Sequence, residues 1–525
     1  MVTGAFTGLN LSLRALYSSK KAMNVTAENI ANANTEGYTR RVAEFKTFGE
    51  NAAGISEPVF GLGADCVTAT RMRDNYLDTK IWNQNSIKSG WSTKNDYYVE
   101  IERILNESSI SDMTGVLDDF YAAMDDFSNN PSSTTYRYLV QNRGVQLTTY
   151  FNETATQLEE LQIELNNNVK TKVDEVNDLI EQIASFNAQI YNIEVMGGEA
   201  STLRDERTLL INRLSELGDV EVIEQEYGKK LVNGSSDIRL TVKFAGKAVV
   251  RHDKYEQLKC ERRIEKENPE DVDGLYDVMW SDGSRIDPTS GELKSTIELR
   301  DGNGEDVDDW VKGVPYYIKQ LNDMAQKFAL AFNEGIVNGE KAYKGHADGY
   351  TFNSEKDATT PEGIRFFSIN NLSSEEFINT KTDVADIVDV YSNLTAKNIT
   401  LSSDVLDDIG NMFRSFVDPT NNNDTDAISS LLDFIEDETL FGSYNLEDNI
   451  SGMITNLGVD AEIAKNLTKS HESIMTQYET QREAYSGVSL DEEGANLLRY
   501  QEMYEAAAKI MSVFSELYDT LVNMV

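Results

Sequence analysis

The C-terminal segment carries an apolar stripe that restricts the fold more than any other feature of the sequence. Apolar or aromatic side chains recur there at alternating spacings of three and four residues, up to the final residue. The members of the stripe are Leu497, Tyr500, Tyr504, Ala507, Met511, Phe514, Tyr518, Leu521 and Val525. This spacing aligns them along one side of an α-helix, as in the seam of a coiled coil. The sequence therefore predicts a long C-terminal helix that buries this face against other helices.

The N-terminal segment carries a second stripe with the same alternation. It is interrupted by Lys20 and consists of Leu9, Leu13, Leu16, Met23, Ala27 and Ile30. A weaker stripe runs over residues 464–485, with His471 as a polar member, and Gly487 separates it from the C-terminal helix. Two interpretations stay open for the terminal stripes, an intramolecular helix pair and an intermolecular bundle. The extension of the C-terminal stripe to the last residue favours the bundle.

Proline is scarce enough to allow long helices, because a proline inside a helix removes a backbone N–H donor and clashes with the preceding turn. The seven prolines leave three long stretches free, residues 1–57, 132–268 and 420–525. Further helices are expected over residues 152–195, 203–217 and 315–333. Gly197 is expected to end the first of these, and Pro315 suits the first turn of the last.

The middle of the chain changes to strand periodicity. Apolar residues alternate with polar ones over Ile238–Phe244. Further strands are expected at Val220–Ile223, Lys247–Val250, Leu275–Trp280 and Thr296–Leu299. Asn233-Gly234 and Asp282-Gly283 supply turn signals between them. We therefore expect an inserted β domain over residues 219–304.

Together these patterns predict an α+β multidomain protein in which long helices from both termini form coiled-coil-like bundles. An inserted β domain and a second small insertion interrupt the helices. The expected units are a terminal helical (coiled-coil) domain with an extended segment (1–95 with 486–525), a helical bundle (96–218 with 305–340 and 450–485), the β domain (219–304) and an acidic insertion (341–449). Within the acidic insertion, the sequence predicts only a small β unit near Arg365–Ile369.

The charge balance argues against nucleic-acid and membrane partners. The chain has 48 basic and 89 acidic residues and a net charge of −41, so it repels phosphate backbones and anionic lipid. Its mean hydropathy is −0.45, and no apolar run approaches the ~18 residues that suggest a membrane span. The N-terminal residues lack the pattern of a cleaved secretory signal peptide.

No set of residues in the sequence predicts a catalytic, metal or cofactor site. The histidines are too scattered for a zinc motif or a catalytic triad, at His252, His346 and His471. Asp301–Asp306 is similar to a calcium loop, but Asp306 and Lys312 stand where an EF-hand needs glycine and glutamate. Cys66 and Cys260 are expected to be buried apolar residues rather than nucleophiles. We therefore expect the protein not to be an enzyme.

Residues Glu28–Arg41 read ENIANANTEGYTRR and predict a helix that ends in a defined polar turn. The string resembles the N-terminal signature of the flagellar axial protein family, which contains rod, hook and hook-associated proteins. The resemblance is carried by Asn29, Asn32, Asn34, Gly37, Tyr38 and Arg40, together with Ile30, Ala31 and Thr35. A second block, from Gly61 through Arg71 to Leu77, resembles the extended segment that follows in this family.

Several further blocks resemble the hook-associated members of the family. They are Asn130–Ser133 with Arg137, Leu203–Val220, Ser290–Leu293, Glu298–Asp301, Tyr316–Asn333 and, most closely, Ser486–Leu521. Rod proteins of the family are much shorter, and its hook proteins have little long helix in their interior. The resemblance therefore covers both ends and several internal blocks, whereas residues 340–450 fall outside it.

The resemblance implies a structural adaptor of the bacterial flagellum that joins the hook to the filament by packing of its terminal helices. It implies an extracellular position at the hook–filament junction, reached by export through the flagellar channel without a cleaved signal peptide. The implied partners are the hook protein, a second hook–filament junction protein, copies of the chain itself in a ring, a cytoplasmic export chaperone that covers Leu490–Val525, and the flagellar export apparatus.

Two alternatives to this interpretation stay open. The first is a divergent hook protein, against which the long helix at 152–195 and the C-terminal block argue. The second is a surface hydrolase or adhesin activity carried by the inserted domains. A hydrolase would need a concave pocket with paired carboxylates ~5–10 Å apart.

Overall fold

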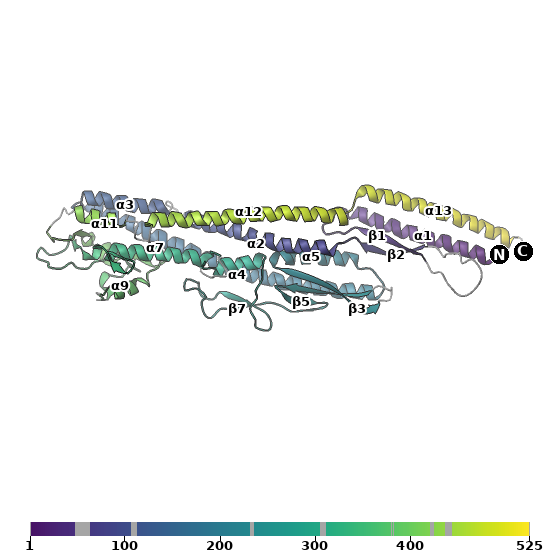
Figure 1. The fold of residues 1–525 in the computed structure, drawn as a ribbon, viewed down its shortest axis with the longest axis horizontal. Helices are drawn as coiled ribbons and strands as arrows, with labels where there is room; N and C mark the ends of the chain where they lie inside the picture. Colours follow the sequence, from purple (N-terminus) through teal and green to yellow (C-terminus); the bar gives the residue numbers. More distant parts are fainter. Residues whose placement is uncertain are drawn as a thin grey trace.

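The computed structural model describes residues 2–47, 64–106, 113–230, 236–304, 311–379, 381, 383–420, 425–435 and 444–523. The chain forms an elongated rod, and its two termini lie side by side at one end (Figure 1). The chain thus leaves this end, turns back at the far end and returns. Long helices along the rod make this return possible.

Two helices from opposite ends of the sequence form the narrow end of the rod. α1 (Val2–Ala31) lies antiparallel to α13 (Leu490–Val522), so the terminal stripes correctly predict long helices (Figure 1). A two-stranded antiparallel ribbon, β1 (Arg41–Thr47) and β2 (Ala64–Arg71), packs against α1. We call α1, α13 and this ribbon the terminal arm.

Long helices also form the body of the rod. α12 (Leu446–Ser486) packs along α2 (Asn75–Asn106), while α4 (Thr134–Val195) packs against α3 (Met113–Asn129) and α5 (Ser201–Leu217). The expected boundary between residues 95 and 96 falls inside α2, and the one between 485 and 486 falls at the end of α12.

α4 begins much earlier than expected, at Thr134 rather than near residue 152. Buried Val140 and Leu147 extend its apolar face in the N-terminal direction, so the helix continues back to the turn after Pro131. Its expected end is confirmed, because Gly197 directly after the cap residue has a left-handed φ of +87°.

The inserted β domain contains a four-stranded antiparallel sheet and a separate hairpin. The sheet has the order β3–β4–β5–β6, and β7 pairs with β8 in the hairpin. The strands are β3 (Val220–Lys230), β4 (Ser236–Phe244), β5 (Lys247–Arg251), β6 (Lys254–Tyr255), β7 (Lys259–Arg262) and β8 (Tyr276–Met279). The strands expected near Val220, Ile238, Lys247 and Leu275 are therefore confirmed.

The strand expected at Thr296–Leu299 is wrong, because these residues lie in helix α6 (Glu292–Asp301). Leu293, Thr296 and Leu299 are buried at helical spacing, and α6 packs against α2 and α4. So short an apolar alternation does not separate a strand from the buried face of a helix. The position of this segment in the fold determines that it is a helix, since α6 returns the chain from the β domain to the helical body.

The far end of the rod is a tip built around α7 (Val314–Glu334). Pro315 lies in the first turn of α7, as expected, and Gly335 ends the helix with a φ of +63°. Short elements pack around it: β9 (Ile336–Val337), β10 (Glu340–Lys341), η1 (His346–Asp348), β11 (Tyr350–Thr351), β12 (Phe367–Ile369), α8 (Ser374–Ile378), α9 (Val384–Tyr391), β13 (Ile399–Leu401), α10 (Ser403–Asp407), η2 (Ile409–Asn411), β14 (Phe413–Ser415) and α11 (Thr425–Ile435). β12 pairs with β13, which confirms the small β unit expected near Arg365–Ile369.

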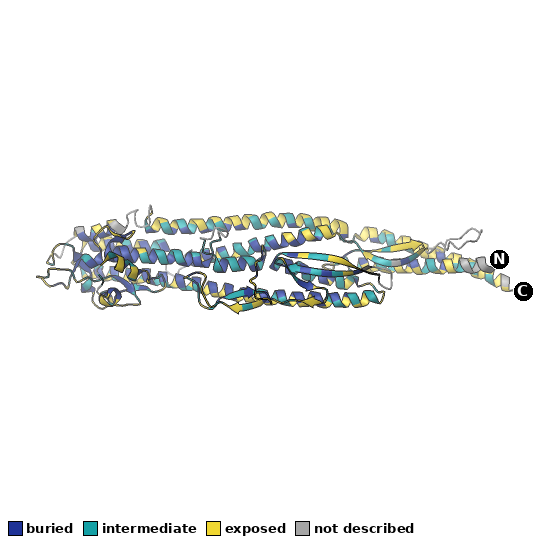
Figure 2. Cartoon of the chain, turned by 60° about the horizontal axis from the view of Figure 1, so that its bottom comes forward, coloured by how far each residue is buried: buried dark blue, intermediate teal, exposed yellow. Residues whose placement is uncertain are grey.

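In the described part of the chain, two hydrophobic cores stabilise the rod, and α4 contributes to both. The core of the tip contains the aromatic cluster Phe120, Phe328, Phe332, Phe366 and Phe367. The other core joins α4 and α5 to the sheet through Ile180, Leu214, Val242 and Phe244. Figure 2 shows buried residues concentrated in the body and tip, whereas the terminal arm is mostly half-buried or exposed. The α+β multidomain class is thus confirmed.

Candidate functional site

Small residues form the most deeply buried face of α1, and Gly8 on this face contacts Phe514 of α13. A Cβ placed on Gly8 would lie 2.3 Å from Cζ of Phe514, so the aromatic ring rests on the α1 backbone. From Gly8 the four–three alternation continues through Ser12, Ala15, Ser19, Ala22 and Thr26. Of these, Ser12, Ser19, Ala22 and Thr26 are buried. Small side chains on this face let the large side chains of α13 come close.

The predicted N-terminal stripe lies beside this contact and stays partly open to solvent. Leu9, Leu16, Met23 and Ile30 are half-buried, while Leu13, Ala27 and the interrupting Lys20 are exposed. Leu11 and Tyr17 add further apolar surface, at 41% and 63% exposure. α1 therefore leaves much of its apolar side-chain surface uncovered.

The predicted C-terminal stripe faces α1. Its members Leu497, Tyr500, Met511, Phe514 and Tyr518 are half-buried, Ala507 is buried and Tyr504 is exposed. Tyr500 also contacts Phe45 of β1, with ring centroids 6.0 Å apart. The side chain of Leu521 and all of Val525 lie outside the described residues.

A second apolar stripe, which we call the outer stripe, runs along the exposed side of α13. It consists of Met503, Ile510, Val513 and Leu517, which are 44%, 50%, 54% and 53% exposed. Spacings of three, four and seven residues put these side chains on one face of the helix. The outer stripe was not predicted from the sequence, although its residues follow the same alternation one position before those of the predicted stripe.

The signature turn connects the terminal arm to the body, and Asn29 determines its shape. The Asn29 side chain is fully buried. Its Nδ2 donates to the Arg41 carbonyl (2.8 Å), and its Oδ1 accepts from the Arg41 N–H (3.0 Å) and the Tyr38 hydroxyl (2.8 Å). Burial raises the pKa of Tyr38 to about 12, which keeps this hydroxyl protonated as a donor. The chain is thereby held in one path between α1 and β1.

Other signature residues attach the turn to distant helices. Arg40 forms ion pairs with Glu492 and Glu493 at the start of α13, both at 2.8 Å. Its backbone N–H donates to the Ser486 carbonyl (2.9 Å) at the end of α12. Gly37 has a φ of +75°, and a Cβ there would lie 2.7 Å from the Leu209 side chain of α5. The signature turn is therefore the joint at which α1, α5, α12 and α13 meet.

The two remaining signature asparagines lie nearer the surface. Asn32 is half-buried, and its Nδ2 donates to the Glu28 carbonyl (2.9 Å) in the last turn of α1. The Thr35 hydroxyl donates to Oδ1 of Asn32 (3.3 Å). Asn34 is exposed. The structure therefore brings most of the signature together at the joint and leaves Asn34 at its surface.

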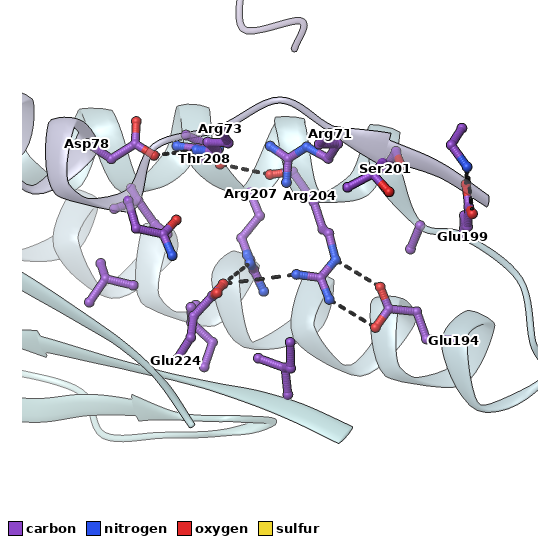
Figure 3. A pocket seen from close by; sticks show the side chains of 18 of the residues that line it. Arg71, Arg73, Asp78, Glu194, Glu199, Ser201, Arg204, Arg207, Thr208 and Glu224 are labelled. Atoms are coloured by element: carbon purple, nitrogen blue, oxygen red, sulfur yellow. Dashed lines mark hydrogen bonds and ion pairs between the residues drawn. The ribbon is translucent and has the colours of Figure 1, made fainter. Parts of the chain in front are cut away.

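An arginine network that was not predicted from the sequence joins the ribbon to α5. Arg71 pairs with Asp205 (2.6 Å), Arg41 approaches the same carboxylate (3.6 Å), and Arg73 pairs with Asp78. Figure 3 shows arginines of the ribbon side and of α5 around one pocket with a cavity volume of about 620 Å³. In the sequence, the only signal for this network is the recurrence of arginine around residues 71 and 204, because the members of the network lie in different elements.

A second pocket of about 750 Å³ lies against the signature turn and the end of α12. It shares Arg73, Asp78 and Thr208 with the first pocket. The two pockets therefore flank the joint where the terminal arm leaves the body. Both are lined by charged side chains of both signs.

The groups considered for chemistry are placed separately. The described residues include no group of three or more His, Cys, Asp or Glu side chains arranged to hold a metal ion. Burial raises the pKa of the thiols of Cys66 and Cys260, to about 11 for Cys260. The end of the segment Asp301–Asp306 lies outside the described residues. Among the helices described, none is long and apolar enough to span a membrane.

Three parts of the chain match known protein families. Residues 98–352 match the flagellar hook-associated protein FlgK helical domain. Residues 9–39, which contain the signature turn, match the flagella basal body rod protein family. Residues 479–524, which contain α13, match the C-terminal part of the flagellar basal body rod FlgEFG proteins.

Full-length relatives extend this similarity to the whole chain. The flagellar hook-associated protein 1 of Bacillus subtilis is 27% identical over 537 residues, which cover 99% of both chains. That of Salmonella typhimurium is 23% identical over 567 residues, covering 98% of this chain and 99% of the relative. The solved flagellar hook junction protein FlgK from Burkholderia pseudomallei aligns with a TM-score of 0.41 and 17% identity, over 55% of this chain and 46% of that one.

Proposed function

We propose that the chain is the structural adaptor that joins the hook of the bacterial flagellum to the filament, because it is similar to flagellar hook-associated protein 1 over nearly its whole length and matches the FlgK helical domain over residues 98–352. The signature turn and α13 match families of flagellar basal body rod proteins, while the helical body matches the FlgK helical domain, so the joint, the arm and the body all resemble parts of flagellar proteins. An adaptor of this kind needs surfaces that bind copies of itself and two different neighbours.

The uneven burial of the terminal arm is the observation that carries this proposal. The small residues of α1 are mostly buried, and Gly8 among them contacts α13, while the leucines of α1 and the outer stripe of α13 stay at least partly exposed. Burying apolar surface contributes roughly 25 cal/mol per Å², so these two faces favour association. Contact between unlike faces of successive copies produces rings or helical assemblies. We therefore propose that copies of the arm pack side by side in a ring.

The partners follow from the position of an adaptor at the end of one assembly and the start of another. We propose that the ring contacts the hook protein on one side and a second hook–filament junction protein on the other. This places the chain outside the cell, at the hook–filament junction. The inserted domains need no enzymatic activity for this role, and we propose none.

Export before assembly requires the outer stripe to be protected. An exposed apolar stripe on a free chain promotes aggregation. We propose that a cytoplasmic export chaperone covers α13 until the flagellar export apparatus passes the chain through the channel without a cleaved signal peptide. Within the described structure, α13 packs mainly against α1. It can therefore separate from the body without breaking the packing of the body helices.

Electron microscopy of cells that lack this gene tests the proposal, together with an assay for flagellin in the medium. We expect hooks without filaments and flagellin lost to the medium, both reversed by the wild-type gene. Missing hooks would indicate a hook protein instead. Intact flagella in the deleted strain would contradict the adaptor role.

A further inference from the structure

The second half of α12 is sparsely packed within the single chain. From Leu446 to Ala464, α12 buries a side chain every three or four residues, and the helix packs along α2 and also contacts α3. Beyond Ala464, the described helix buries only Met475 before it ends at Ser486. A helix in a protein draws most of its stability from the packing of one face. The second half of α12 therefore lacks much of the cover that its first half has.

The two sides of α12 that flank its buried side differ in charge. One side carries exposed charged residues such as Glu462, Lys465 and Glu472, as expected of a face that contacts water. The opposite side carries apolar and aromatic residues at spacings of four and seven, which place them along one side of a helix. We call it the α12 face, and its members are Val459, Ile463, Leu467, Ile474, Tyr478 and Tyr485.

The α12 face is only partly covered. Val459, Ile463 and Tyr485 are 49%, 47% and 48% exposed, and its other three members are half-buried. Asp460 lies at the edge of the face, but its carboxylate is paired with Lys312 of the same chain at 2.8 Å. At 1.5 Å per residue the face extends over ~39 Å of helix. Exposed apolar surface of this extent is typical of an interaction site.

The position and the charge of the α12 face favour a second copy of the chain as its partner. α12 and α13 follow one another along the same edge of the rod (Figure 1). The α12 face therefore extends the exposed apolar surface of the terminal arm lengthwise into the body. Two copies of a chain with a net charge of −41 repel each other. Contact between copies is thus favoured at a face that is apolar and carries no unpaired carboxylate.

We propose that the α12 face docks against the body of a neighbouring copy of the chain, so that copies joined through their arms are also joined through their bodies. This inference rests on the proposed function, in which the copies form a ring. Burial of the α12 face would remove apolar surface from water. The neighbouring body would also supply the cover that the second half of α12 lacks.

Photo-crosslinking from the position of Ser470 tests which molecule covers the α12 face. Ser470 is exposed and lies between Ile463 and Ile474 on this side of the helix. The photoreactive residue p-benzoylphenylalanine is introduced there in the full chain, and isolated hook–filament structures are irradiated. We expect a crosslinked dimer in which mass spectrometry finds peptides of this chain alone. The same residue introduced at Thr476, which is exposed on the charged side, is the control and should give no dimer.

The outcomes of this experiment separate the inference from the function on which it rests. A crosslink from the position of Ser470 to the hook protein or to another flagellar protein alone overturns the inference, as does the absence of any crosslink. A chain that is missing from the isolated hook–filament structures contradicts the adaptor role itself, and the inference falls with it.

Charged substitutions in the α12 face provide a second test. Val459→Asp with Ile463→Asp should reduce the number of filaments per cell by about tenfold or more, because two unpaired carboxylates would be buried against the neighbour. The melting temperature of the purified chain should shift by less than about 2 °C, because both side chains are about half exposed. Normal filament numbers with this variant overturn the inference.

Thr476→Asp with Thr480→Asp is the matched control for this variant. It adds the same two charges at the same spacing, at exposed positions on the charged side of α12. Filament numbers should stay within about twofold of the wild type, because charges on this side remain in water. If Val459→Asp with Ile463→Asp prevents folding, the crosslink from the position of Ser470 decides, since that variant keeps both apolar side chains.

Discussion

At the scale of single residues, Asn29 shows how one side chain fixes the path between two elements. Its amide satisfies both the N–H and the carbonyl of Arg41 in a fully buried position. Asparagine suits this position because its amide both donates and accepts. The sequence predicts a turn here, but not the second half of the joint, since Arg40 and its partner Glu493 are 453 positions apart.

Asn29→Ala is expected to loosen the joint by about 2 kcal/mol or more, because two buried backbone groups lose their partner. Hydrogen exchange across residues 26–47 of the full chain would report this as faster exchange. Asn34→Ala, at the exposed position of the same signature, is the matched control and should change stability by less than about 0.5 kcal/mol. Equal effects of the two variants would contradict the role given to Asn29.

The burial of His346 is expected to make the tip sensitive to acid. Its ring is buried among Phe332, Phe366 and Phe413. Nδ1 lies 2.8 Å from the Ile364 carbonyl, and Nε2 accepts the N–H of Phe413 at 3.3 Å. Burial lowers the pKa of His346 to about 4, so the folded tip holds the neutral ring. Protonation would place an unpaired charge in the aromatic cluster.

The tip is therefore expected to lose stability as the pH falls from about 6.5 to about 4. In this window the unfolded chain binds the proton and the folded chain does not. The neutral His346 ring therefore contributes on the order of 3 kcal/mol to the free energy of unfolding above pH 6.5, and this contribution is lost as the pH falls to about 4. Hydrogen exchange at β12 and β14, measured at several pH values, checks this. His346→Gln should reduce the pH dependence of hydrogen exchange at β12 and β14, and His471→Gln should leave it unchanged. The reverse result would contradict the role given to His346.

At the scale of elements, the sequence predicts the helices better than it predicts which faces meet. The apolar stripe of α13 faces α1, as its spacing indicates. On α1 the hydrophobic pattern selects the leucines, but the residue that packs directly against Phe514 is Gly8, and the small residues in register with it are more deeply buried than the leucines. Hydrophobic periodicity identifies the apolar side of a helix, whereas the close approach of two helices depends on where small side chains lie.

The outer stripe of α13 is expected to serve assembly rather than folding. Ile510→Asp with Val513→Asp should leave helix content and thermal stability unchanged, because both side chains are about half exposed. The same double variant should fail to support filaments in cells, because two charges cannot be buried against a neighbour without a partner. Electron microscopy of cells and circular dichroism of the purified chain give the two measurements.

Ser512→Asp with Ser515→Asp is the matched control, since it adds the same charges at exposed polar positions of α13. It should assemble normally. Met511→Asp with Phe514→Asp provides the contrast, because these side chains face α1 and their replacement should separate the two helices in the isolated chain. Normal filaments with the Ile510 and Val513 variant would exclude the outer stripe as an assembly surface.

At the scale of the whole molecule, the hydrophobic cores lie in the body and the tip, whereas the terminal arm holds the exposed apolar stripes that we propose for assembly. α4 passes through both hydrophobic cores and so couples the tip to the β domain. The terminal arm has few buried residues and is attached through the signature turn and the arginine network (Figure 2). The sequence predicts this division in outline, because both terminal stripes lack local partners. It does not predict the network, which depends on side chains brought together from β2, α2 and α5.

Removal of residues 490–525 should therefore leave the body and tip folded. α13 contacts α1 extensively, and the ion pairs of Arg40 with Glu492 and Glu493 are its described links to the joint. We expect the melting temperature of the body to shift by less than about 2 °C, with loss of hydrogen-exchange protection confined to α1. Leu457→Ala, in the fully buried face of α12, is the comparison and should cost about 2–5 kcal/mol. A truncated chain that loses as much stability as Leu457→Ala would mean that the arm is part of the folding unit, and the half-buried stripes would then serve the monomer rather than the ring.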